Sequence, residues 1–419
     1  MERTALVKPN ASVNKERDYW NVLEMSKLVT PYQSKHLPVY RWYSYKHSFS
    51  RNLVHYIIDK YNLKESDNIL DPFCGAGTTL LASKERGIGA IGLDLMPLSV
   101  LATNVKLHKY SKRTIFEINQ KLMSKPVEHI NLKHNPSFEM LKKYFPKQNF
   151  DWILAFKYLI MEIEDGKYRD LFLLCLLSIL EESSYTRKDG AFIRTIDKTH
   201  LFPAKENFQL KLKQISEDLW FINSLKETKS EAILADARAT NLNPRSVTSV
   251  ITSPPYPNRH DYTRIYLLEL MIGFLDEYDD VKSLRYNLLR SHVEARQRFP
   301  SEDYIIPDGL KFDLAALKKE SLPNENVLNL VEGYFKDMHL VLKEMYRVLK
   351  DDGSAHIVIG DARYGGVNIY AGKYIIELAK NIGFEHVETI KARDKGNSPQ
   401  QMGKYGKSYS LESIVCLRK

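Results

Sequence analysis

The 419-residue chain has little cysteine and no long apolar run, and each absence excludes a class of protein. Its three cysteines, Cys74, Cys175 and Cys416, are too few and too scattered for a disulfide framework, and Cys and His nowhere have zinc-site spacing. The longest largely apolar run, Leu171 to Leu180, is about half of what spans a bilayer, and the N-terminus lacks the apolar core of a secretory signal. We expect a soluble cytoplasmic protein without a metal site.

Basic residues outnumber acidic ones. The chain has 61 Lys and Arg against 52 Asp and Glu, a formal net charge of +9 and a pI near 9.0. This excess favours an acidic partner, such as a nucleic acid, over a small neutral one. The length is that of about two to three domains.

Strand-like and helix-like segments alternate at both ends of the chain but not in its middle. Residues 1–38 are polar and punctuated by proline, which predicts an N-terminal arm. Residues 39–104 and 231–419 alternate strands with helices, which predicts one discontinuous α/β domain with an open, largely parallel sheet. Residues 105–230 have long amphipathic stretches and no clear alternating strands, so we expect a mostly helical insertion. Ligands should bind at the carboxyl ends of the strands.

The stretch "ILDPFCGAGTT" predicts a strand that ends in a tight glycine turn. Gly75 and Gly77 let backbone N–H groups approach a ligand closely, and Asp94, at the end of the next strand, can accept both hydroxyls of a ribose. The turn lacks the third glycine of a dinucleotide site and the Lys-Ser/Thr of a P-loop. Asp71 precedes it, where a cationic ligand would lie. S-adenosylmethionine suits this arrangement better than NAD or ATP, although a glycine turn alone can also be a plain strand-to-helix connection.

Asp236, in "AILADAR", follows a third strand-like run. Its carboxylate could accept a hydrogen bond from an adenine amino group. It could equally cap a helix. The sequence leaves both roles open.

The stretch "TSPPY", Thr252 to Tyr256, predicts a rigid corner directly after another strand. In a parallel sheet this corner should lie at the same edge as the glycine turn. Tyr256 offers a flat face for stacking a base, and the Ser253 hydroxyl and Pro254 carbonyl could accept hydrogen bonds from an exocyclic amino group. Those bonds would localise the amine lone pair and direct it at a methyl donor. Such a base must first be flipped out of its duplex.

Two further segments carry candidate substrate-binding residues. In "NRHDYTR", Asn258, Asp261 and Tyr262 could line a base pocket, although Asp261 is also well placed to cap a helix. In "SSYTRKDGAFIR", Arg187 and Lys188 could meet backbone phosphates, as could a merely solvated loop.

The paired motifs resemble the amino-group DNA methyltransferases, the cytosine-N4 and adenine-N6 enzymes. "DPFCGAGTT" resembles that family's cofactor loop and "TSPPY" its catalytic motif, whereas no Pro-Cys supports attack on cytosine C5 by a thiolate such as Cys74. "RVLKDDGSAHIVIGDARYGG" and "RWYSYKHSFSRNL" resemble the family's later strand and helix and the helix before its cofactor loop. The resemblance covers about residues 40–104 and 231–419.

The resemblance implies a Rossmann-like methyltransferase fold with a largely parallel seven-stranded sheet, and S-adenosyl-L-methionine as cofactor. The cofactor-binding residues implied or expected are Asp71, Phe73, Gly75, Gly77, Thr78, Asp94 and Asp236. The catalytic ones are Ser253, Pro254, Pro255 and Tyr256.

Serine at the first position of the tetrapeptide resembles the cytosine-N4 subset. We therefore expect a site-specific DNA methyltransferase acting on cytosine N4 in double-stranded DNA. The resemblance also implies a role in a restriction-modification or related defence system, with a cognate endonuclease as a candidate partner whose presence the sequence leaves open. Adenine N6 and RNA are alternative targets, and a catalytically silent DNA-binding protein with this fold is an alternative of another class. Residues 105–230 depart from the compact family pattern and are a candidate target-recognition region. The recognition site and oligomeric state stay open.

Overall fold

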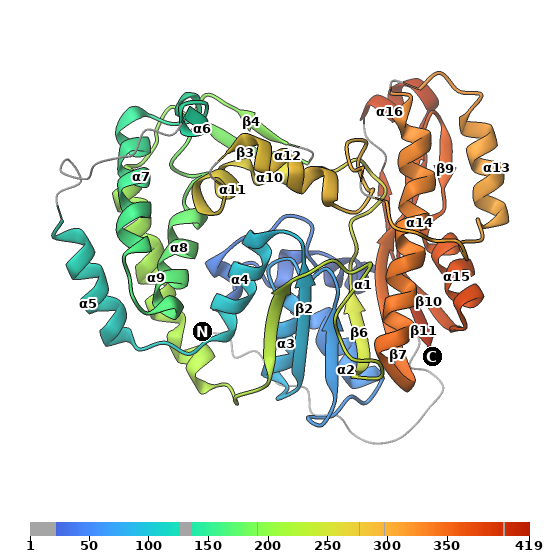
Figure 1. Cartoon of the computed structure of the whole chain (residues 1–419), viewed down its shortest axis with the longest axis horizontal. Helices are drawn as coiled ribbons and strands as arrows, with labels where there is room; N and C mark the ends of the chain where they lie inside the picture. Colours follow the sequence, from blue (N-terminus) through green and yellow to red (C-terminus); the bar gives the residue numbers. More distant parts are fainter. Residues whose placement is uncertain are drawn as a thin grey trace.

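A seven-stranded sheet forms the centre of the computed structural model, which describes residues 22–125, 136–190, 192–275, 277–296, 298–322, 324–396 and 399–419 (Figure 1). The strand order is β10-β11-β7-β6-β1-β2-β5. Strand β11 runs antiparallel to both its neighbours, and the other pairings are parallel. The strands are β1 (Asn68–Asp71), β2 (Gly89–Asp94), β5 (Ser230–Leu234), β6 (Val247–Thr252), β7 (Leu349–Gly360), β10 (Glu385–Gly396) and β11 (Tyr409–Arg418). The predicted Rossmann-like fold with seven strands is confirmed.

Helices cover both faces of this sheet because successive strand residues point to opposite sides. In β1, Ile69 packs with helix α2 (Arg51–Lys60) and helix α3 (Thr78–Glu85). Leu70 packs on the other face, with helix α14 (Asn326–Val348) and helix α15 (Ala371–Ile382). Ser50 caps α2 by accepting a hydrogen bond from the backbone N–H of Asn52, as its position before the helix predicts.

The first described residues are part of the sheet domain. Helix α1 (Val22–Leu28) contacts β10, and Met25, Leu28 and Val29 are buried in the core beside α2. The predicted arm over residues 1–38 therefore folds onto the domain from residue 22 onward, because its apolar side chains are buried there. Residues 1–21 lie outside the described residues.

Between β2 and β5 the chain leaves the sheet and forms a separate layer, which we call the helical lobe (Figure 1, left). Helix α4 (Pro97–Leu107) returns along the sheet and contacts α8 of the lobe. The lobe helices are α5 (Lys112–Met123), α6 (Pro136–Glu139), α7 (Lys147–Met161), α8 (Gly166–Ser178) and α9 (Ala204–Ser224). The lobe also contains a hairpin that the sequence did not indicate, β3 (Thr186–Lys188) with β4 (Ile193–Thr195). Strands of three residues are too short to show an alternating pattern.

Smaller elements follow β6 and flank the later strands. Helices α10 (Tyr262–Ile265), α11 (Leu267–Gly273) and α12 (Tyr278–Asn287) connect the carboxyl end of β6 with the helical lobe, since α11 contacts α4, α6, α7 and α8. The remaining elements are α13 (Asp308–Leu317), the hairpin β8 (Ala362–Tyr364) and β9 (Val367–Ile369), and α16 (Pro399–Tyr405). None of the described helices is long and apolar enough to cross a membrane.

Candidate active site

The glycine turn and the proline corner lie side by side at one edge of the sheet. They follow β1 and β6, which are adjacent parallel strands with Leu70 opposite Val250. The Thr252 hydroxyl donates a 2.7 Å hydrogen bond to Oδ1 of Asp71, which joins the ends of the two strands directly. The sequence motifs are therefore neighbours, as their positions after parallel strands predict.

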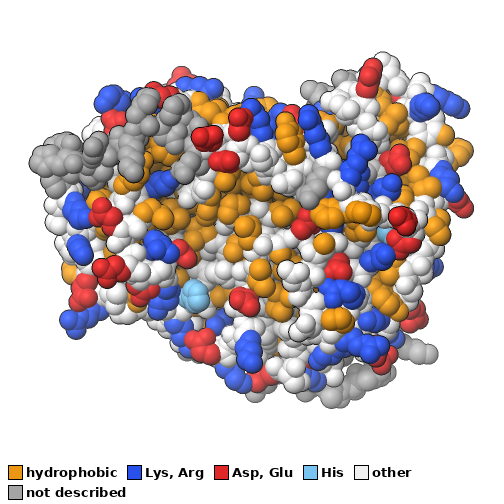
Figure 2. Space-filling model, in the orientation of Figure 1, with side chains coloured by type: hydrophobic (Ala, Val, Ile, Leu, Met, Phe, Trp, Pro, Cys, Tyr) orange, Lys and Arg blue, Asp and Glu red, His pale blue; other side chains and the backbone are white. Residues whose placement is uncertain are grey.

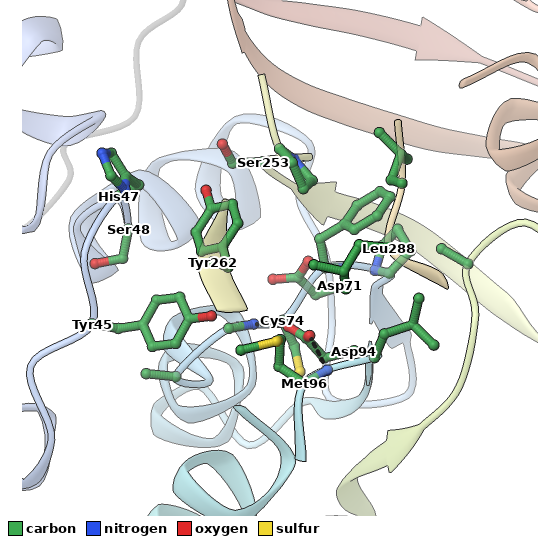
Figure 3. A pocket seen from close by; sticks show the side chains of 18 of the residues that line it. Tyr45, His47, Ser48, Asp71, Cys74, Asp94, Met96, Ser253, Tyr262 and Leu288 are labelled. Carbon is green, nitrogen blue, oxygen red and sulfur yellow. Dashed lines mark hydrogen bonds between the residues drawn. The ribbon is translucent and has the colours of Figure 1, made fainter. Parts of the chain in front are cut away.

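A cavity, here called the glycine-turn cavity, opens at this edge, and its empty space together with its open mouth is about 900 Å³. Figure 3 shows the carboxylates of Asp71 and Asp94 and the rings of Tyr45 and Tyr262 around it. Other lining residues include Phe73, Gly75, Thr78, Met96, Asp236, Ser253, Pro255, Leu288 and Leu289. The cavity thus combines the buried acid Asp71 and the partly exposed acid Asp94 with apolar and aromatic walls.

The backbone of the glycine turn is set by its two glycines. Gly75 and Gly77 have φ of +50° and +79°, a region that other residues rarely adopt. A Cβ on Gly77 would lie 2.7 Å from Cγ2 of Thr103 on α4, so the turn can pack against that helix only without a side chain. Gly77 stands at the N-cap position of α3 and packs beside the cavity without lining it.

Asp94 and Asp71 are held by hydrogen bonds on opposite sides of the turn. Asp94 accepts backbone N–H groups from Gly75 at 3.0 Å and Met96 at 2.8 Å. Asp71 accepts the hydroxyl of Thr79 at 2.6 Å as well as that of Thr252. Burial raises the pKa of each carboxyl to about 6, although these hydrogen bonds act in the opposite direction. Both carboxyls are therefore mainly ionised at neutral pH, and they can attract a cationic ligand or accept hydrogen bonds from hydroxyl groups.

Asp236 lines the glycine-turn cavity, and of the two roles considered from the sequence the structure excludes only the helix cap. No helix begins at this residue. Its two carboxylate oxygens accept hydrogen bonds from Arg238, at 2.9 Å from Nε and 2.7 Å from Nη2. The alternative of a helix cap is wrong, because residues 236–239 form a turn closed by a hydrogen bond from the Ala239 N–H to the Asp236 carbonyl, with the Asp236 carboxylate paired to Arg238.

A second cavity, which we call the corner cavity, lies beyond the proline corner, and its empty space together with its open mouth is about 950 Å³. Pro254 and Tyr256 line it, Pro255 lines the glycine-turn cavity, and Ser253 lines both. The Tyr256 hydroxyl donates a 2.7 Å hydrogen bond to Glu412 of β11. A Cβ on Gly360 would come within 2.8 Å of the Tyr256 ring, so the end of β7 supports that ring closely.

The two cavities share a wall. The residues that line both are His47, Ser48, Phe49, Ser253 and Tyr262. The His47 and His260 rings both line the corner cavity and pack against each other, with 4.6 Å between ring centroids. Burial lowers the pKa of His47 to about 3 and that of His260 to about 4, with nearby Lys395 acting in the same direction, so both imidazoles are neutral at pH 7.

The predicted substrate residues after the corner separate into two groups. Asn258 and Tyr262 line the corner cavity, and Tyr262 stacks on Tyr45 at 6.4 Å between ring centroids. Asp261 is turned away from both cavities. Its carboxylate caps α10 and pairs with Arg285 at 2.9 Å, so its contacts are those of the helix cap that was the alternative role considered from the sequence.

The predicted phosphate ligands on the β3–β4 hairpin also differ from each other. Arg187 is exposed, and it lies opposite Arg194 in the hairpin register. The ammonium group of Lys188 is buried, pairs with Glu269 and lies over the rings of Tyr43 and Tyr266. Lys188 therefore fixes the hairpin to α11 and is unsuited to bind a phosphate at the surface.

Several lining residues were missed by sequence reasoning. Tyr45 contributes a cavity wall from the segment before α2, and Leu288 and Leu289 contribute one from the segment after α12. Lys395 and Glu412 reach the corner cavity from β10 and β11. Only Tyr45 had a usable signal, since it lies within the matched stretch "RWYSYKHSFSRNL". Cys74 is a buried free thiol whose pKa is raised by burial, so it is not poised as a nucleophile.

Comparison with known proteins identifies related chains along nearly the whole length. The DNA methylase family model matches residues 3–104 and 247–419, which leaves out the helical lobe. Type II methyltransferase M.AvaI of Nostoc sp. strain PCC 7120 is 31% identical, over 94% of this chain and 89% of its own length. Type II methyltransferase M.BsoBI of Geobacillus stearothermophilus is 30% identical, over 96% of this chain and 91% of its own.

Proposed function

The chain belongs to the DNA methylase family, and on that premise we propose that it methylates the N4 amino group of a cytosine flipped out of double-stranded DNA. S-adenosylmethionine is the methyl donor of this family and the cofactor of this chain. When bound, it supplies a methyl group that is electrophilic because it is attached to a sulfonium sulfur. The remaining chemistry depends on how the residues of the two cavities hold the donor and the base.

The glycine-turn cavity fits this cofactor on its own chemistry. Asp71 and Asp94 are anionic groups in a largely apolar cavity, which suits a ligand with an ammonium group, a sulfonium centre and ribose hydroxyls. We assign the methionine part to the Asp71 and Gly75 side and the ribose to Asp94. Phe73, Leu288 and Leu289 offer apolar surface for the adenine ring, and the turn at Asp236 lies beside them.

The corner cavity is where we place the base. Cytosine N4 is a poor nucleophile because its lone pair is delocalised into the ring. The Ser253 hydroxyl and the Pro254 carbonyl would accept the two amino hydrogens, while Tyr256 stacks on the ring. In the structure the Ser253 hydroxyl donates a weak 3.4 Å hydrogen bond to the Tyr256 hydroxyl, so the Ser253 oxygen stays free to accept one. Held in this way, N4 would present its lone pair to the methyl group that the donor supplies from the glycine-turn cavity, and the proton that N4 then gives up would pass to water.

One observation supports this function best: Ser253 lines both cavities at once. An amino group held by this residue would face the donor across the shared wall, as direct in-line transfer requires. Serine at this position also favours cytosine N4 over adenine N6, by the family tendency. A role in marking a specific site alongside a cognate endonuclease is proposed from the two Type II relatives.

We propose that the helical lobe takes part in reading the target sequence. The family model leaves this part of the chain out, and the loop of its β3–β4 hairpin lies beside His260 of the corner cavity, since a Cβ on Gly190 would be 3.7 Å from Nε2 of that histidine. A segment at the mouth of the base cavity is suitably placed to contact DNA next to the flipped base.

The test combines product analysis with one variant. Purified protein is incubated with labelled S-adenosylmethionine and plasmid DNA, and the DNA is digested to nucleosides for mass identification. We expect N4-methylcytosine; N6-methyladenine would favour the other amino-group reaction. Duplex binding without label transfer would identify a catalytically silent DNA-binding protein.

Tyr256→Ala should abolish transfer and leave the Kd for the cofactor nearly unchanged, because Tyr256 lines only the corner cavity. Phe312→Ala is the matched control, since this aromatic residue is 76% exposed on α13. Loss of cofactor affinity in Tyr256→Ala would refute the division of roles between the two cavities.

A further inference from the structure

A lysine occupies the corner cavity without having a part in methyl transfer. Lys395, at the end of β10, lines this cavity, and its Nζ lies 4.9 Å from the centroid of the Tyr256 ring. Its side chain is 35% exposed, and it donates a 3.1 Å hydrogen bond to Oε1 of Glu412. A base stacked on Tyr256 would therefore lie within reach of this ammonium group.

The surroundings of Lys395 hold its charge in place. Glu412 is 2% exposed and also binds the Arg393 guanidinium and the Tyr256 hydroxyl. One carboxylate thus fixes the catalytic ring and the lysine together. An ammonium group has three N–H donors, and one of them is directed to Glu412. Burial lowers the pKa of Lys395, because the charged form is only partly solvated in this cavity.

Cytosine and adenine differ in what they would offer this donor. Along the edge that carries the exocyclic amino group, cytosine presents N4, N3 and then the O2 carbonyl oxygen. Adenine presents N6, N1 and then a C–H group. A half-buried cationic donor placed at the third position would be satisfied by cytosine and left without an acceptor by adenine, and this difference would discriminate between the two bases.

We propose that Lys395 donates a hydrogen bond to the O2 oxygen of the flipped cytosine and thereby selects cytosine over adenine. This inference rests on the proposed function, because it assumes that the base stacks on Tyr256 with its amino group at Ser253. Glu412 acts as a positioning residue, since it holds Lys395 and Tyr256 in register. Arg393 also lines the cavity, but the structure places no such contact between its guanidinium and the ring.

The experiment compares two target bases in one duplex. The methylated site is first located by sequencing DNA from expressing cells with modification detection. Duplexes are then made with either cytosine or a 2-aminopyridine C-nucleoside at the target. This analogue keeps the amino group and the adjacent ring nitrogen but has C–H in place of the O2 carbonyl. The ratio of kcat/KM for the two duplexes, at pH 8, measures the contribution of O2.

For the wild-type protein we expect the analogue to lower kcat/KM at least about tenfold. Lys395→Met should lower kcat/KM for cytosine by a similar factor and bring the ratio close to one, because the donor that senses O2 is gone. Lys391→Met is the control, since Lys391 lies on the same strand, is 51% exposed and lines neither cavity. It should retain the wild-type ratio.

Two results would overturn the assignment. A Lys395→Met ratio equal to that of the wild type would show that O2 is sensed elsewhere. A wild-type ratio close to one would by itself refute a contact to O2, whether or not the variant folds. Failure of the proposed function is seen separately, as N6-methyladenine or no product from the wild type with its natural DNA.

Discussion

At the scale of single residues, the two acids of the glycine-turn cavity make cofactor binding depend on pH. Asp71 and Asp94 have pKa values of about 6 in the folded protein, raised by burial. Their ionised forms attract a cation and accept hydroxyl groups, and their protonated forms do so weakly. Since protonation competes with the ligand, affinity should be constant above about pH 7 and should fall as pH decreases through 6.

We therefore expect the Kd for S-adenosylmethionine to rise at least about tenfold between pH 7.5 and pH 5, measured by isothermal titration calorimetry. Asp71→Asn should bind more weakly at pH 7.5 and show a shallower pH dependence, because one of the two titrating groups is removed. Circular dichroism at pH 5 controls for unfolding. An affinity independent of pH in the wild-type protein would mean that neither carboxyl titrates in this range.

At the scale of elements, the β3–β4 hairpin presents an arrangement that is unfavourable without a partner. Arg187 and Arg194 lie directly opposite each other, and like charges in that position destabilise a strand pair. Both arginines are exposed, Arg194 at 61%, and Arg194 also pairs with Asp189. A phosphate of DNA at the mouth of the corner cavity would relieve this repulsion.

Arg187→Ala should accordingly weaken duplex binding and reduce the slope of log K against log salt concentration by about one, as expected for the loss of one phosphate contact. Fluorescence anisotropy with labelled duplex at several salt concentrations gives both values. Arg113→Ala is the control, because Arg113 is 87% exposed on α5 in the same lobe. An unchanged slope in Arg187→Ala would remove the hairpin from the DNA interface. The Kd for the cofactor should not change in either variant.

The elements also show how far the sequence could predict this site. The glycine turn and the proline corner were predictable as neighbours because both follow parallel strands, and strand direction alone brings their ends together. The contact between Lys188 and Glu269 was not predictable, because it depends on how the hairpin packs on α11. Lys395 and Glu412 gave no local signal either. Their place in the corner cavity follows from the antiparallel pairing of β10 and β11, some 140 to 160 residues after the corner in the sequence.

At the scale of the whole molecule, net charge does not locate the DNA surface. On the face shown in Figure 2, Lys and Arg side chains are interspersed with Asp and Glu, and hydrophobic side chains gather across its middle. The formal excess of +9 is thus not gathered into one stripe on this face. The cavities and the loops around them are a better guide to the DNA-binding surface. A buried network of ion pairs holds two of those loops in place.

Asp337 of α14 is the centre of that network. It is fully buried and pairs with Arg290 at 2.5 Å and with Arg238 at 3.1 Å. Arg238 in turn binds Asp236 and the backbone carbonyl of Asn287. The Asp337 carboxylate therefore fixes both the turn at 236–238 and the segment at 287–290. Residues of these two segments form one wall of the glycine-turn cavity.

Asp337→Asn should lower the free energy of unfolding by about 3–5 kcal/mol, because it leaves buried arginine charge without its partner. It should also raise the Kd for S-adenosylmethionine although Asp337 does not line the cavity, since the wall carrying Leu288 and Leu289 loses its anchor. Urea denaturation and calorimetry measure the two effects. Asp351→Asn is the control: its pair with Arg245 is exposed, at 70% and 67%, and its loss should cost no more than about 1 kcal/mol. Destabilisation with unchanged cofactor affinity would show that the wall keeps its shape without the network, and that the cavity is organised from the glycine turn alone.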